Sequence, residues 1–168
     1  MTPLPAALGG RDLVAWRLDR QRFAATWDSG EGAFLAGGRW NGKGARAVYC
    51  SIDPSTAILE VAVHTGFAVL DTVPHVLTAL TVTDPSEVHV VDPASVPNPN
   101  WLRPGIPGAG QQAFGDDLLR MHKFVLIPSA VSTHSWNLLF VASAAAGSYA
   151  LRSQEPFALD TRLHPARP

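Results

Sequence analysis

The chain has 168 residues, of which 46% are hydrophobic, and its formal net charge at pH 7 is -1. This length and composition are typical of one globular domain with a core of its own, and the near-neutral charge without a basic block excludes a phosphate-tracking nucleic-acid surface. The longest apolar runs, 61–70 and 138–146, are too short to span a bilayer. With no charged and apolar leader and a single cysteine, Cys50, we expect a cytoplasmic protein that binds neither membranes nor nucleic acid directly.

The first half of the chain predicts two strands and one well-marked helix. The strands lie at residues 14–18 and 45–51, with a brief helix at 22–27 and an irregular, glycine-rich stretch at 30–44 between them. Asp53 then supplies an N-cap with Pro54 at the first helical position, and Gly66 ends the helix that follows.

The second half of the chain predicts several more strands and one helix. The strands lie at 76–82, 87–91, 124–127, 136–141 and 157–159, and the helix at 111–122. Residues 92–110, with five prolines, form a long loop, which is more often a binding element or a lid than a plain connection. Because the helices are too few to cover both faces of a parallel sheet, the predicted fold is a single α+β domain with a mixed or antiparallel sheet.

The glycine-rich loop does not match a nucleotide-binding motif. Residues 37–43 have the spacing of a P-loop, but Gly44 replaces the Ser or Thr that would hold a metal ion, and a strand follows where the motif needs a helix. The six histidines also lack a metal-ligand spacing such as His-Glu-x-x-His. We therefore predict no metal site.

Three residues in and after this loop are candidates for ligand binding. Arg39 suits a phosphate or a carboxylate because its guanidinium donates in a bidentate fork and the neighbouring glycines let backbone amides approach. Taken alone, it fits a solvated loop arginine better. Trp40 and Tyr49 could each stack on a planar ring or cover the core. The residues alone leave these alternatives open.

Glu60 needs an explanation, because it interrupts a helical stretch, 57–64, that otherwise has the character of core. Arg17 in the first strand is one candidate partner for its charge. His64, four residues on, lies on the same helical face, either in a shared site or in a half-buried polar pair. Ser129 ends a strand, from which its hydroxyl could reach into a cleft or merely terminate the strand.

These fragments, in this order, resemble the RES domain, the toxin half of a bacterial toxin-antitoxin system that is named for Arg, Glu and Ser. The matching segments are the opening strand at 16–18, the arginine loop at 38–41, the next strand at 48–51, the glutamate helix at 57–64, the serine segment at 127–131, the strand at 136–139 and the closing strand at 157–163. The resemblance implies one RES-like domain over residues 1–168, with its core at about 14–163.

The resemblance further implies an ADP-ribosyltransferase-like fold and an enzyme that takes NAD as its substrate and needs no prosthetic group. It assigns Glu60 to the positive charge that develops on the ribose when nicotinamide leaves, as in glycoside cleavage. Arg39, with Arg17, is expected to hold the pyrophosphate.

Other parts of the ligand are assigned in the same way. Tyr49 or Trp40 is expected to stack on nicotinamide, and Ser129 to bond to the ribose or the amide. The resemblance and the residue chemistry together predict one cleft, lined by Arg39, Tyr49, Glu60 and Ser129.

The acceptor distinguishes three activities. Attack by inorganic phosphate would make an NAD phosphorylase, attack by water an NAD glycohydrolase, and attack by a protein side chain an ADP-ribosyltransferase. NAD degradation is favoured because the sequence reveals no surface for a protein target. The alternative from another class is a catalytically silent domain that binds a nucleotide or an antitoxin.

The resemblance also implies a cognate Xre-like, DNA-binding antitoxin, with the 92–110 loop as its contact region.

Overall fold

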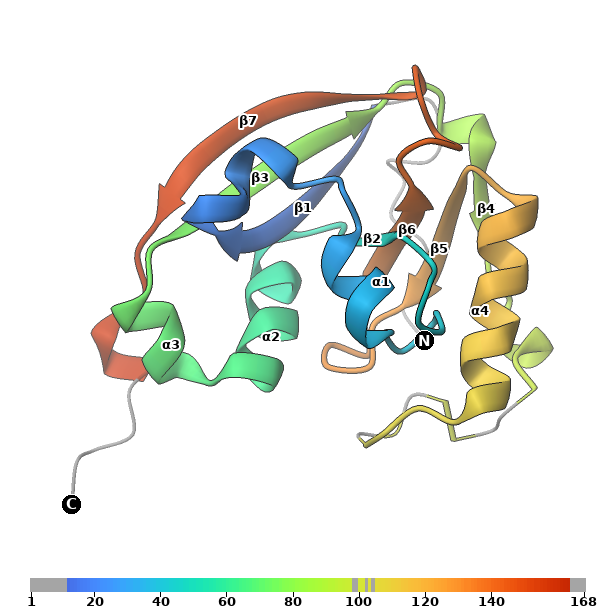
Figure 1. Cartoon of the computed structure of the whole chain (residues 1–168), viewed down its shortest axis with the longest axis horizontal. Helices are drawn as coiled ribbons and strands as arrows, with labels where there is room; N and C mark the ends of the chain where they lie inside the picture. Colours follow the sequence, from blue (N-terminus) through green and yellow to red (C-terminus); the bar gives the residue numbers. More distant parts are fainter. Residues whose placement is uncertain (1–11, 98–99, 102, 104, 164–168) are drawn as a thin grey trace.

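The computed structural model describes residues 12–97, 100–101, 103 and 105–163, which form an α+β structure on one mixed sheet (Figure 1). The strands are β1 (Leu13–Arg20), β2 (Ala47–Ser51), β3 (His75–Val82), β4 (Val88–Val90), β5 (Phe124–Pro128), β6 (Trp136–Val141) and β7 (Tyr149–Phe157). The α-helices are α1 (Glu31–Ala36), α2 (Pro54–Thr65), α3 (Phe67–Thr72) and α4 (Ala109–Met121). Short 3-10 turns lie at Gln21–Thr26, Pro85–Glu87, Pro93–Ser95 and Thr161–Leu163. The predicted α+β class with a mixed sheet and few helices is confirmed.

The sheet places strands from both halves of the chain side by side. Its order is β4-β5-β6-β2-β1-β3-β7, in which β4 and β5 pair parallel and the other neighbours antiparallel. Strand β6 lies between β2 and β5, with Asn137 opposite Ser51 on one side and opposite Ile127 on the other. Strands β1 and β2 meet at the pair Trp16 and Ser51, and Figure 1 shows the β1–β3–β7 part arching away beyond this junction.

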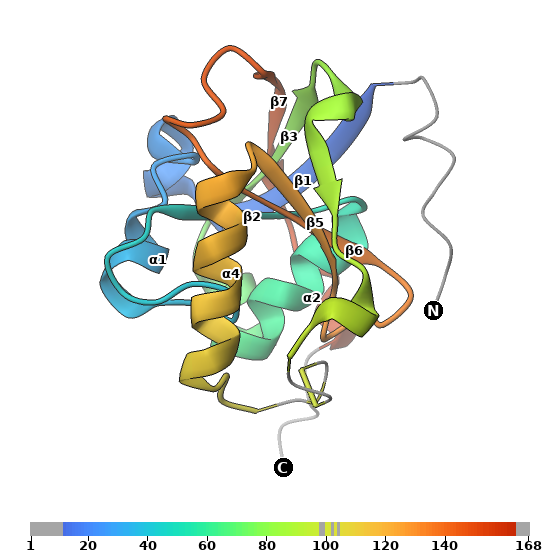
Figure 2. The same cartoon turned by 90° about the vertical axis from the view of Figure 1, so that its right-hand side faces the viewer.

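Alternate side chains of the central strands enter different cores, as strand geometry requires. On one face, Val48 of β2 and Phe140 of β6 belong to a cluster closed by Trp27. On the opposite face of β2, β5 and β6, the side chains pack with Trp40 and with the buried leucines of α4. A third cluster joins α2 and α3 to β1 around Leu18. Helices α2 and α4 therefore lie at different parts of the sheet, as Figure 1 shows. In Figure 2, which is seen from the side of α4, that helix lies in the foreground with α2 behind it.

Two predictions of local structure are wrong. The sequence predicts a strand at 157–159, whereas β7 occupies Tyr149–Phe157 and Leu159 packs into the third cluster beyond its end. Most side chains of β7 are exposed, so its sequence lacks the hydrophobic alternation that marks a strand. The stretch expected to be irregular at 30–44 contains α1, which has only six residues and no buried side chain.

The predicted 92–110 loop is largely confirmed where it is described. It contains the 3-10 turn Pro93–Ser95, and α4 begins at Ala109. Residues 98, 99, 102 and 104 of the loop lie outside the described residues. Among the helices that the structure describes, none combines the length and the apolarity needed to cross a bilayer.

Candidate active site

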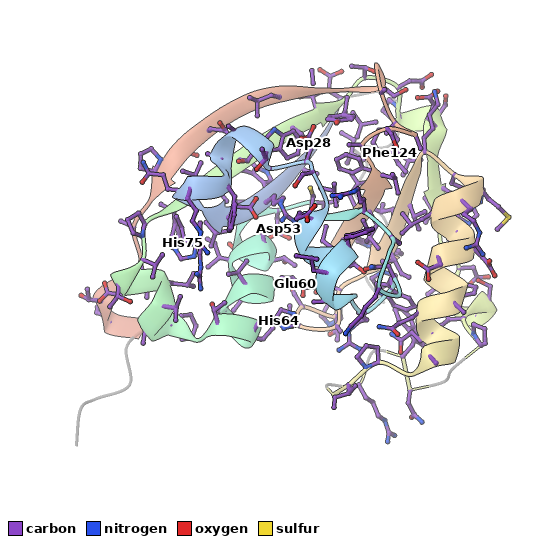
Figure 3. All side chains as sticks on the ribbon, in the orientation of Figure 1. Asp28, Asp53, Glu60, His64, His75 and Phe124 are labelled. Atoms are coloured by element: carbon purple, nitrogen blue, oxygen red, sulfur yellow. The ribbon has the colours of Figure 1, made fainter. Side chains whose placement is uncertain are left out.

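Helix α2 carries Glu60 and is fixed at both ends. The side chain of Asp53 accepts a hydrogen bond from the Thr56 N–H at 2.8 Å, Pro54 lies in the first turn, and Gly66, with a φ of 78°, ends the helix. The helix predicted from these signals is confirmed. Glu60 is half-buried, and Figure 3 shows it on α2.

Two neutral side chains hold one oxygen of Glu60. Its Oε1 accepts a hydrogen bond from the Ser129 hydroxyl at 2.8 Å and another from the Asn137 side-chain amide at 2.5 Å. Ser129 follows β5 and Asn137 lies in the neighbouring β6. Within the described ranges, no Arg or Lys forms an ion pair with Glu60, and no donor contacts its Oε2. The carboxylate is thus held firmly without being neutralised.

Ser129 is fully buried, and its hydroxyl uses every bonding position. The residue is 0% exposed, and its oxygen accepts hydrogen bonds from the N–H groups of Val131 at 3.2 Å and Ser132 at 3.1 Å. Its one proton goes to Glu60. In this arrangement Ser129 supports Glu60, and contact with a ligand would require the hydroxyl to turn away from the carboxylate.

Arg17 does not pair with Glu60. Its Nε and Nη2 donate to the carboxylate of Asp19 at 2.6 and 2.7 Å, and its Nη1 donates to the carbonyl of Tyr49 at 2.9 Å. Arg17 also acts on the Cys50 thiol: burial raises the pKa of Cys50 to about 12, and the charge of Arg17 acts to lower it. The partner of Arg17 is therefore its neighbour two residues along β1, and not the carboxylate on α2.

The guanidinium of Arg39 is bound by backbone carbonyls. Its Nη1 donates to Trp101 at 3.1 Å and Arg103 at 3.5 Å, and its Nη2 donates to Gly105 at 3.3 Å. Over the part of the chain that is described, no carboxylate forms an ion pair with Arg39. These contacts bring part of the 92–110 loop to the arginine and leave its positive charge without a counterion there.

Helix α4 holds the Arg39 loop, residues 37–44, through hydrogen bonds to the loop backbone. The side chain of Gln112 donates to the carbonyl of Gly38 at 2.8 Å, and Oδ2 of Asp116 accepts from the N–H of Gly42 at 3.0 Å. Both contacts involve the loop backbone, so they position the loop whatever its side chains are. The sequence gives no signal for them, because they join residues 74 apart.

Trp40 belongs to the core beneath this loop. It is 1% exposed, and its ring lies 5.4 Å from that of Trp101 and 6.5 Å from that of Phe114. The backbone is equally close-packed, since a Cβ on Gly115 would come within 2.0 Å of the Trp40 carbonyl oxygen. Of the two roles open from the sequence, the structure supports the packing role for Trp40.

Tyr49 stands within electrostatic range of both candidate charges. Its hydroxyl donates to Asn41 Oδ1 at 2.7 Å and accepts from the Trp40 N–H at 3.0 Å. Burial raises the pKa of Tyr49 well above its ordinary value of 10.0, the Glu60 carboxylate acts in the same direction, and Arg39 acts against them. The phenol therefore stays protonated and links the Arg39 loop to the Glu60 side of the site.

Two polar residues near Glu60 were not singled out from the sequence. Asn137 is 7% exposed, and its Oδ1 accepts a hydrogen bond from the Ser51 hydroxyl at 2.8 Å. A usable signal existed, because Asn137 is an amide inside the otherwise apolar strand Trp136–Val141, and a buried amide needs partners.

The predicted site residues are thus partly brought together. Glu60 contacts Ser129, and Tyr49 lies in range of Glu60 and Arg39, whereas His64 is exposed and forms no hydrogen bond with Glu60 in the described part of the chain. Two surface hollows, of about 310 and 420 Å³, are lined by other residues, so the shared cleft stays a prediction. The described residues hold no group of three or more His, Cys, Asp or Glu side chains suited to a metal ion.

The chain is similar in sequence to two bacterial toxins. The chain is 29% identical over 129 residues to "Toxin Res" of Photorhabdus laumondii, covering 76% of this chain and 80% of the relative. It is also 29% identical over 155 residues to "Toxin Res" of Yersinia enterocolitica, covering 90% and 99% of the two chains.

A solved structure shares the fold. A chain in the crystal structure of the M. tuberculosis MbcT-MbcA toxin-antitoxin complex superposes with a TM-score of 0.70 at 24% identity, over 88% of this chain and 85% of the other. The family model of the RES domain matches residues 14–160, which include every candidate residue described above. On this match, the chain belongs to the RES domain family.

Proposed function

We propose that this RES domain is the toxin of a toxin-antitoxin pair and that it degrades NAD by cleaving the nicotinamide–ribose bond. The observation that carries the proposal is the state of Glu60, whose Oε1 is bound by two neutral donors while no described cation compensates its charge. A fixed, uncompensated carboxylate suits a reaction in which positive charge develops on the substrate. The names of the curated relatives support the toxin role.

The chemistry asks little else of the protein at the breaking bond. The bond between the ribose anomeric carbon and the pyridinium nitrogen breaks, and its electron pair stays on nicotinamide, which leaves as a neutral molecule without an acid catalyst. The ribose then carries oxocarbenium character, which the Glu60 carboxylate stabilises. Attack by phosphate oxygen yields ADP-ribose phosphate, and attack by water yields ADP-ribose and a proton.

The other residues fit supporting roles in this proposal. Arg39 would bind the pyrophosphate, exchanging its hydrogen bonds with the carbonyls of the 101–105 segment for bonds to charged oxygens, which are stronger. Tyr49 is the better candidate for stacking on nicotinamide, because Trp40 is buried in the core. Arg17 would have to share its guanidinium between Asp19 and a phosphate, so we give it the smaller part.

An enzyme that destroys NAD must be restrained in its own host, so the proposal includes a cognate antitoxin of the Xre-like, DNA-binding kind. An acidic or carboxylate-ended antitoxin segment would compete with NAD for Arg39. The solved structure with the same fold was determined as a toxin-antitoxin complex, which supports a partner of this class.

The test is to incubate the purified chain with NAD, with and without inorganic phosphate, and to identify the products, with Glu60→Gln as the matched control. We expect nicotinamide release by the wild type and its loss in the variant. ADP-ribose phosphate would identify a phosphorylase and ADP-ribose a glycohydrolase, whereas label transferred to protein would favour an ADP-ribosyltransferase. An absence of turnover, together with harmless expression in cells, would favour a silent binding domain instead.

A further inference from the structure

We infer that Asn137, oriented by Ser51, is a positioning residue that sets the geometry of the Glu60 carboxylate. The inference rests on the proposed function, because it gives these two residues a part in NAD cleavage. Neither residue is expected to touch NAD. Their contribution acts through Glu60 alone.

The chemistry of the three groups fixes the direction of every hydrogen bond. An ionised carboxylate can only accept, so the Asn137 side chain must turn its NH₂ group toward Glu60. Its carbonyl oxygen then faces Ser51, and this oxygen can only accept, so the Ser51 hydroxyl donates. The chain of bonds therefore runs from Ser51 to Asn137 to Glu60 and has no alternative polarity.

The backbone holds this chain in register. Ser51 and Asn137 are directly opposite each other in the antiparallel pair β2–β6, where side chains of opposed residues lie on the same face. The two residues are 2% and 7% exposed, so water does not compete for the bonds. A side-chain amide that is buried and bonded at both ends has little freedom to rotate.

The arrangement makes the two oxygens of Glu60 inequivalent. Both Ser129 and Asn137 donate to Oε1, at 2.8 and 2.5 Å, and among the described residues nothing donates to Oε2. The two donors, one in β6 and one directly after β5, converge on one oxygen and restrict the orientation of the carboxylate. The remaining oxygen is then presented in a single orientation, which is what stabilising a charge that exists only in the transition state requires.

The experiment compares NAD turnover by the full chain carrying Asn137→Ala, Asn137→Asp, Ser51→Ala or Ser51→Thr. Asn137→Ala and Asn137→Asp should lower kcat about 10- to 100-fold with KM within about twofold of wild type, since a misplaced group loses mainly transition-state stabilisation. Ser51→Ala should lower kcat less. Ser51→Thr, which keeps the hydroxyl, should retain most of the wild-type kcat.

Ser148→Ala is the matched control. Ser148 is also buried, at 7% exposed, and accepts a hydrogen bond from Lys123 at 3.1 Å in the turn before β7, away from Glu60. It should alter the unfolding midpoint as Ser51→Ala does and leave kcat unchanged. A kcat for Asn137→Ala within twofold of wild type would overturn the inference, as would an equal fall in Ser148→Ala.

A second readout separates this inference from the proposed function. The measured quantity is the ¹³C chemical shift of the Glu60 carboxyl carbon, whose signal is assigned by its absence in Glu60→Gln. This chemical shift should change in Asn137→Ala and Ser51→Ala and stay the same in Ser148→Ala. If the wild type does not consume NAD, the proposed function fails. The carboxyl shift then decides by itself whether Asn137 positions Glu60, and an unmoved signal would overturn that claim.

Discussion

The two candidate charges of the site are held in opposite ways. Glu60 is held by two side chains, the hydroxyl of Ser129, directly after β5, and the amide of Asn137 in the adjacent β6. Arg39 is held by main-chain carbonyls of the 101–105 segment. Both charges are half-buried, and in the described residues neither has an ion-pair partner.

The difference suggests how each charge is used. Side-chain donors on a sheet cannot move far, so the Glu60 carboxylate is fixed before any ligand arrives. Carbonyls on a loop can be exchanged for stronger acceptors on a ligand, so Arg39 suits binding better than chemistry. Substitutions should therefore separate the two regions, with turnover responding to one and affinity to the other.

The strongest test of this separation is Glu60→Gln. The amide keeps the size of the side chain but removes the negative charge, so we expect kcat for NAD to fall about 10²- to 10³-fold. KM and the thermal unfolding midpoint should change little, since the variant keeps its acceptor for Ser129 and Asn137. Near-wild-type turnover would remove Glu60 from the chemistry.

Arg39→Ala should act on binding. Loss of hydrogen bonds to a charged group corresponds to about 1.5–3 kcal/mol, so we expect KM for NAD to rise roughly tenfold or more while kcat changes less. Arg46→Ala is the matched control, because that arginine forms an exposed ion pair with Glu31 near the same loop. Equal effects of both substitutions would point to general charge rather than to a bound phosphate.

Gly115→Ala should disturb the Arg39 region through its backbone. The added Cβ would lie 2.0 Å from the Trp40 carbonyl oxygen, so the loop or the helix must shift. We expect the free energy of unfolding to fall by about 1–3 kcal/mol in denaturant titrations. Gly110→Ala, in the same helix with open space around the new Cβ, should instead gain up to about 1 kcal/mol. Matching losses in the two variants would contradict the close packing described here.

The smallest effect should be an acid sensitivity at the start of α2, the helix that carries Glu60. Burial alone would raise the pKa of Asp53, but hydrogen bonds from Ser135 and Thr56 outweigh it and lower the pKa below its ordinary value of 3.8. The native state therefore binds this proton less readily than the unfolded chain does. The resulting stabilisation is complete above about pH 4 and is lost as pH falls through the native pKa.

Asp53→Asn should accordingly flatten the acid side of a plot of unfolding midpoint against pH. Asp160→Asn is the comparison, because the ion pair of Asp160 with Arg162 lies at the surface and should contribute little. An unchanged acid slope in Asp53→Asn would mean that this cap does not secure the N-terminus of α2.

Local signals explain which parts of the fold could be predicted. Asp53, Pro54 and Gly66 define α2 by the chemistry of its own ends, and the structure follows them. Strand β7 has no such signal, because its exposed side chains rely on pairing with β3 for their conformation. The partner of Arg17 did have a local signal that was missed, because Asp19 lies two residues along the same strand and residues at that spacing share a face.

The candidate site shows the same limit. Glu60 stands out in the sequence as a charge in an apolar helix, but its donors are 69 and 77 residues away. Asn137 could have been flagged as an amide in an apolar strand, whereas its partners could not be named without the β2–β6 register. The polarity of a side chain in an apolar element shows that it needs a hydrogen-bond partner, and the strand order and register determine which residue that partner is.

Strand β6 lies between β2 and β5 in the sheet but is synthesised after both of them. Both donors to Glu60, Ser129 and Asn137, leave the ribosome long after the helix that carries the carboxylate. Until β6 is inserted between its neighbours, the Glu60 carboxylate lacks the Asn137 donor, although α2 can already pack on β1 and α3. On the proposed function, chains truncated before β6 should therefore be inert, because the hydrogen bonds that position Glu60 form only late in synthesis.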